Sequence, residues 1–180
     1  RQRRGRGPGR AGDGRAAGAA RAARAARLTT DEEEIMATRI SAGRSLARRC
    51  AMQALYQWRM TRQAPSEIEA SFIANSKLTG KNRDYFLCLI KNIPEHIEKI
   101  DQLIAAHLDR DPDKVDLLEQ AILRLAAYEL NFGRDIPPKV VLDEAVNLAK
   151  LFCSENGYKY VNAVLDKIAR AVGGLNAPAH

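Results

Sequence analysis

The sequence has little of what metal sites, disulfide frameworks and membrane spans require. Its 180 residues include three cysteines, Cys50, Cys88 and Cys153, which lie far apart and share no metal-ligand spacing. Each falls on an apolar helical face, so we expect small buried side chains in a reducing compartment, the cytoplasm. No apolar run is long enough to span a membrane, and the basic N-terminus lacks the apolar segment of a secretory signal. We therefore expect no metal, no disulfide and no membrane contact.

Aromatic residues are also scarce, at 6% of the chain, and no segment shows the apolar–polar alternation of a strand. The 46% of hydrophobic residues are mainly Leu, Ala, Ile and Val, and they concentrate in helical patterns. The strongest pattern is residues 117–130, whose apolar side chains would cover almost the whole circumference of a helix. Such a helix lies inside a domain with other helices packed on several faces. The sequence thus predicts an all-α fold organised around this helix.

The flanking patterns predict the other helices and their ends. Pro94 should kink or split the helix that covers residues 82–107. Either Asp113 or Asp116 should cap the central helix. The remaining expected elements share a 3.6-residue apolar period: a helix over 43–61, one beginning near Ser66, one entered through Ile136–Pro138 with proline at its first position, and one over 158–172 between Asn156–Gly157 and Gly173–Gly174.

The basic excess is concentrated at the N-terminus. The net charge is +7, and the first 35 residues carry +4 of it in a low-complexity Arg/Ala/Gly segment. This segment cannot bury a core, so we expect residues 1–40 to be a disordered tail ahead of a helical domain at 41–174, with 175–180 disordered. The tail is either a basic arm that follows phosphates or a segment outside the natural protein, whose start would be Met36.

A second basic cluster lies at the start of the helix over 43–61. Cations at a helix N-terminus interact unfavourably with the macrodipole, so this cluster needs an explanation other than helix stability. Phosphate binding would supply one, and a solvated basic face is the alternative. Gln53 and Tyr56 follow Arg49 on the face opposite the apolar arc, with Arg48 beside them. Cations and aromatic rings on one face are what single-stranded RNA requires.

The remaining ionisable residues give weaker signals. Glu129 should point to the buried side of the central helix, where a carboxylate needs partners. We expect backbone N–H groups of the following loop to provide them. His96 and His107 have no carboxylate or cysteine at ligand spacing, which favours ordinary, partly exposed histidines.

Three blocks of the sequence resemble one family, the bacterial transcription antitermination factor NusB. They are residues 48–58 (RRCAMQALYQW), 121–130 (AILRLAAYEL) and 136–166, from the Ile-Pro pair to YVNAVLD. The resemblance covers about Ser41 to Val172. It implies seven helices in two packed sub-bundles, no catalysis and no cofactor. It also implies binding of single-stranded boxA RNA of ribosomal RNA leaders, jointly with ribosomal protein NusE, within the RNA polymerase antitermination complex.

The helix faces and the resemblance together give the candidate residues. The resemblance implies a protein-partner contact at Glu119. At Asn156, where the family often has an acid, repulsion from phosphate is removed, which should raise RNA affinity. The expected RNA-binding residues are Arg39, Arg44, Arg48, Arg49, Gln53, Tyr56, Asn156, Lys159 and Tyr160. Tyr56 and Tyr160 would form one clasp if the first and last helices pack side by side.

Two other functions remain open from the sequence. A similar helical unit occurs fused to ribosomal RNA cytosine methyltransferases, although this chain shows no glycine-rich loop or strand for the cofactor domain such an enzyme needs. The other alternative is a helical adaptor that binds proteins alone. The protein could be a monomer or a homodimer.

Overall fold

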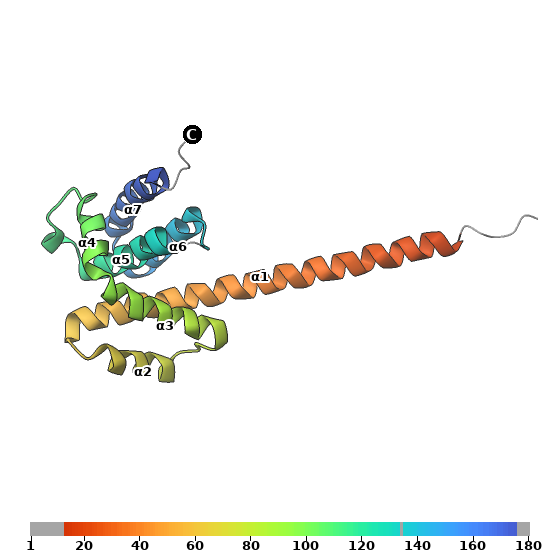
Figure 1. Cartoon of the computed structure of the whole chain (residues 1–180), viewed down its shortest axis with the longest axis horizontal. Helices are drawn as coiled ribbons and strands as arrows, with labels where there is room; N and C mark the ends of the chain where they lie inside the picture. The colour runs from red at the N-terminus through yellow and green to blue at the C-terminus, as the bar shows by residue number, and fades with distance from the viewer. Residues whose placement is uncertain (1–12, 134, 176–180) are drawn as a thin grey trace, which may run out of the picture. The chain divides into compact units, whose positions relative to one another are not determined.

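The computed structural model describes residues 13–133 and 135–175, and every element within them is helical (Figure 1). This confirms the predicted all-α fold of seven helices. One short 3₁₀ turn, η1, precedes the central helix. The elements are α1 (Asp13–Thr61), α2 (Pro65–Asn75), α3 (Gly80–Glu95), α4 (Ile97–Ala105), η1 (Pro112–Lys114), α5 (Leu117–Phe132), α6 (Pro138–Phe152) and α7 (Glu155–Leu175).

The chain divides into two units, Arg1–Ser41 and Ala42–His180, and α1 runs through the boundary. The helix begins at Asp13 rather than near Gly43. Its extension is rich in Ala, Arg and Glu, which are strong helix formers, and contains no proline to stop it. In the first unit the side chains from Glu34 to Ser41 are exposed. The disorder expected for residues 1–40 stays a prediction, and residues 1–12 and 176–180 lie outside the described part.

Helix α5 is the centre of the second unit, as the sequence predicts. It packs against α3, α4, α6 and α7. Its fully buried side chains include Ile122, Leu123 and Leu125, which point in different directions around the helix. Burial on several faces explains why the segment is apolar nearly all round.

Two sub-bundles share this core, as expected. Helices α4 to α7 form the C-terminal one, in which α5, α6 and α7 all contact one another. In the N-terminal one, the part of α1 after Ala42 contributes Met52, α2 contributes Ile68, and α3 contributes Phe86 and Leu89, all buried. Phe72 and Phe86 join α2 to α3 with their ring centroids 5.9 Å apart.

Local signals set most helix ends. Pro94 lies in the last turn of α3, and α4 begins at Ile97, so the predicted split is confirmed. Asp116 caps α5 by accepting a hydrogen bond of 2.8 Å from the backbone N–H of Leu118. Pro138 is the first residue of α6, which confirms the predicted proline entry.

The ends of α7 differ from the prediction. The helix starts at Glu155, so Asn156 and Gly157 lie in its first turn instead of breaking the chain, and it continues through Gly173 to Leu175. At Gly157 an added Cβ would lie 2.5 Å from Oε1 of Glu119. This glycine therefore allows close packing between α7 and α5 rather than a turn.

The cysteine prediction holds only in part. Cys50 is buried, but Cys153 is half-buried and Cys88 is exposed on the outer face of α3. Burial, helped by Glu119 and Asp116, raises the pKa of Cys153 to about 11, so this thiol stays protonated at neutral pH. Within 13–133 and 135–175, no helix is both long and apolar enough to cross a bilayer.

Candidate nucleic-acid interface

The outer face of α1 carries a stripe of three polar or aromatic side chains, Arg49, Gln53 and Tyr56, which we call the α1 stripe. Their spacing of four and three residues places them on one side of the helix. Arg49 is exposed, and Gln53 and Tyr56 are half-buried. The stripe therefore presents an exposed cation and a partly exposed ring on the same side of the helix.

Arg49 also lines a shallow groove of about 380 Å³ between α1 and α6. Leu151, which is 70% exposed, lies on the α6 side of this groove. The other lining residues are Ala42, Ser45, Leu46, Glu144, Asn147 and Leu148. The groove thus places a cation beside apolar and amide groups that suit an unpaired base.

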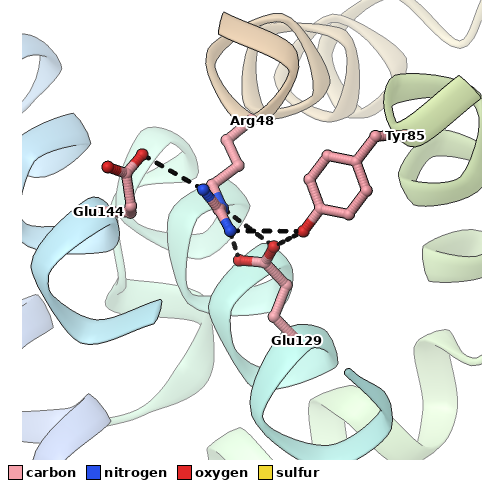
Figure 2. A network of polar contacts seen from close by, with 4 residues as sticks. All are labelled: Arg48, Tyr85, Glu129 and Glu144. Atoms are coloured by element: carbon pink, nitrogen blue, oxygen red, sulfur yellow. Dashed lines mark hydrogen bonds and ion pairs between the residues drawn. The ribbon is translucent and has the colours of Figure 1, made fainter. Parts of the chain in front are cut away.

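Arg48 is a correction to the predicted interface. Its side chain is only 2% exposed, because α1 turns it inward against α5 (Figure 2). Its Nε donates to both carboxylate oxygens of Glu129, at 2.9 and 3.0 Å, and Nη1 donates to Glu144 at 3.4 Å. A guanidinium held in this way is not available to phosphate, so Arg48 is a structural residue.

Glu129 is a second correction. Its partners are the side chains of Arg48 and Tyr85, whose hydroxyl donates to Oε1, rather than backbone N–H groups of the next loop. Burial raises the pKa of Glu129 to about 7, and the guanidinium of Arg48 opposes that rise. Arg48, Tyr85, Glu129 and Glu144 form what we call the buried polar cluster, which joins α1, α3, α5 and α6 (Figure 2).

Two other predicted arginines have different surroundings. Arg44 is half-buried, with its Cζ 5.4 Å from the centroid of the Tyr85 ring. This cation–π contact orients its guanidinium at the edge of the buried polar cluster. Arg39 is exposed and belongs to the first unit.

The first two turns of α7 hold two of the candidates. Asn156 and Lys159 are both exposed. The Nζ atom of Lys159 lies 2.7 Å from Oε1 of Glu155, one helical turn earlier. Because this pair is exposed on both sides, the lysine can exchange its carboxylate partner for a phosphate at little cost.

Tyr160 is a third correction. Its ring is only 8% exposed, and the guanidinium of Arg110 covers it with Cζ 3.6 Å from the ring centroid. The ring therefore offers no open face for a base. Burial raises the pKa of its hydroxyl, Arg110 opposes this, and Asp109 and Glu119 add to it. Side-by-side packing of Tyr160 with Tyr56 stays a prediction.

Glu119, the predicted protein contact, is also largely inside the protein. It is 8% exposed, and its carboxylate lies against Gly157 of α7. Burial, followed by the nearby charge of Asp116, raises its pKa. Its position in the structure supports a role in joining α5 to α7 rather than an open contact with a partner.

Sequence reasoning missed Tyr85, Glu144 and Arg110. One signal for the buried cluster was present: Arg48 is followed at four and seven residues by Met52 and Leu55, both buried, so it shares an inward stripe. Arg110 lies in the turn-rich connector before η1, where no periodicity indicates a direction. In the described residues no cluster of His, Cys, Asp and Glu side chains could hold a metal ion.

The fold and this face define an all-α protein with a cationic and aromatic surface. Residues 45–170 match the model of the NusB family. The transcription antitermination protein NusB of Pasteurella multocida (strain Pm70) is 46% identical over 126 residues, which are 70% of this chain and 88% of that protein. The chain therefore belongs to the NusB family.

Solved structures agree with this assignment. One shows the antitermination factors NusB and NusE in complex with dsRNA; its matching chain has a TM-score of 0.67 and 31% identity, covering 72% of this chain and 98% of its own. A structure of T. maritima NusB has a TM-score of 0.66 and 33% identity, and the match covers 71% of this chain and 90% of the T. maritima chain. The family match at residues 45–170 lies within the second unit.

Proposed function

We propose that this chain is a transcription antitermination factor that binds boxA RNA of ribosomal RNA leaders together with ribosomal protein NusE. It would act without catalysis, in the cytoplasm, within the RNA polymerase antitermination complex. The observation that carries the proposal is the α1 stripe, which pairs the free guanidinium of Arg49 with the ring of Tyr56. A relative of this chain has been solved with NusE and dsRNA.

The interface we propose differs from the one the sequence suggested. Arg48 and the ring of Tyr160 are left out because both are buried. In the second unit the phosphate contacts fall to exposed or half-buried residues: Arg44, Arg49, Asn156 and Lys159. Arg39, in the first unit, would add a separate contact. About four such contacts give modest, salt-sensitive affinity, so sequence preference needs Tyr56, Gln53 and the protein partner.

The test is a binding titration with labelled boxA RNA, a scrambled sequence and a boxA duplex, each with and without NusE. We expect single-stranded boxA with NusE to bind most tightly. Arg49→Ala should weaken binding and lower the slope of log affinity against log salt by about 1. Arg170→Ala, an exposed arginine near the far end of α7, is the control with the same charge change.

The outcomes separate the alternatives. Equal affinity for boxA and the scrambled RNA, both with and without NusE, would exclude boxA recognition. Binding to NusE without any RNA dependence would indicate a protein-only adaptor. Tighter binding of the duplex would replace the single-stranded target with a double-stranded one.

A further inference from the structure

The connector between α4 and α5 presents a guanidinium at the start of α7. Arg110 lies with Cζ 3.6 Å from the centroid of the Tyr160 ring. Its own side chain is 45% exposed, whereas Tyr160 is 8% exposed. The guanidinium of Arg110 therefore faces solvent here, and the ring of Tyr160 lies beneath it.

The loop that carries Arg110 is fastened in place. Lys114 donates its backbone N–H to the carbonyl of Asp111 at 2.9 Å, which closes η1. The side-chain amide of Gln120 on α5 donates to the carbonyls of Val115 and Pro112, at 2.9 and 3.3 Å. These bonds hold the backbone next to Arg110, so the guanidinium is oriented before any ligand arrives.

The neighbouring charges indicate which part of a nucleic acid would fit. Oδ1 of Asp109 lies 3.5 Å from Nε of Arg110. The carboxylate of Glu119 also interacts electrostatically with both Arg110 and Tyr160. These carboxylates repel phosphate. A neutral base has no such conflict, and a planar guanidinium stacks well on one.

We propose that Arg110 is an RNA-binding residue that stacks on an unpaired nucleobase with its outer face, while Tyr160 supports its inner face. The inference rests on the proposed RNA-binding function and adds a contact to it. Lys159, which is exposed and directly precedes Tyr160 in α7, would hold the adjoining phosphate.

The experiment measures binding of boxA RNA to the full chain carrying Arg110→Ala, Arg110→Lys or, as the control, Arg170→Ala. Losing one stacked base weakens binding by roughly five- to a hundred-fold. We expect that loss for Arg110→Ala and for Arg110→Lys, which keeps the charge but not the plane. The control should change affinity less than two-fold, and the salt slope should stay constant for all three because no phosphate contact is removed.

A second measurement locates the base. Each boxA nucleotide is replaced in turn by an abasic one, and at one position wild type and Arg110→Ala should bind equally, since the base and its stacking partner are both needed. Thermal unfolding checks that each variant is folded. If Arg110→Ala binds as tightly as wild type or more tightly, or if Arg110→Lys restores affinity, the stacking role is wrong. If instead the wild type binds boxA no more tightly than the scrambled RNA, the proposed function itself is wrong.

Discussion

The buried polar cluster and the α1 stripe use the same residue types for different purposes. Each pairs an arginine of α1 with a tyrosine, and the two arginines, Arg48 and Arg49, are adjacent in the chain. Arg48 faces two carboxylates inside the protein and Arg49 faces solvent. Residue type therefore does not decide between folding and binding here; the direction in which α1 points the side chain does.

The largest effect should be the difference in unfolding free energy between alanine substitutions at these two arginines. Arg48→Ala leaves the carboxylate of Glu129 buried without its cation, which costs about 3–5 kcal/mol of unfolding free energy. Arg49→Ala should cost at most about 0.5 kcal/mol, since it removes only an exposed charge. Urea unfolding at pH 8 measures both. Similar losses for the two variants would mean that the ion pair with Glu129 contributes little.

The buried polar cluster should also make stability depend on pH. The folded pKa of Glu129 is raised to about 7, above its usual 4.5, so the folded state binds more protons between these values. This group's contribution is full below about pH 4.5 and is lost as the pH rises through 7. Between these two limits the unfolding free energy should fall by roughly 3 kcal/mol through this group. Glu129→Gln cannot ionise and should lose this dependence.

The measurement is unfolding free energy against pH for wild type and Glu129→Gln. The unfolding free energy of the wild type should fall relative to that of Glu129→Gln between pH 4.5 and 8. A constant difference across that range would show that Arg48 and Tyr85 hold the carboxylate ionised throughout, and that burial is not the dominant influence on its pKa.

On the α1 stripe, substitution should affect RNA more than folding. Tyr56→Leu keeps apolar contact with the core but removes the ring, so boxA affinity should fall by the value of one stacked base, about 1–3 kcal/mol. Tyr56→Phe is the matched control and should bind like wild type. The check is an RNA titration beside thermal unfolding. A loss of stability as large as the loss of affinity would place Tyr56 with the buried residues.

The sequence was sufficient for the fold because its signals are local and repeated. The apolar period placed the helices, Pro94 marked the α3–α4 break, and Asp116 and Pro138 marked helix starts. It failed at the ends of α7, because glycine permits a turn but does not require one. In the first turn of α7, Gly157 is needed for close packing against Glu119, a constraint that only the tertiary structure reveals.

The candidate site was predictable only in part. The outward direction of Arg49 and Tyr56 follows from helical spacing alone. The burial of Arg48 depends on Glu129, which is 81 residues away in the chain. Arg110 reaches Tyr160 from a connector with no periodicity. Contacts of this kind depend on how the helices pack, and a pattern read along one helix does not contain that information.

The smallest effect should be at Tyr160, which lies outside the buried polar cluster and is 8% exposed. In the part of the chain that the structure describes, its buried hydroxyl has no hydrogen-bond partner. Tyr160→Phe keeps the ring under Arg110, so it should change unfolding free energy by no more than about 0.5 kcal/mol and leave boxA affinity unchanged. Calorimetric unfolding and the same RNA titration test this. A loss above about 1 kcal/mol would show that the hydroxyl is hydrogen-bonded, and Asp109, which raises the pKa of Tyr160, is the candidate acceptor.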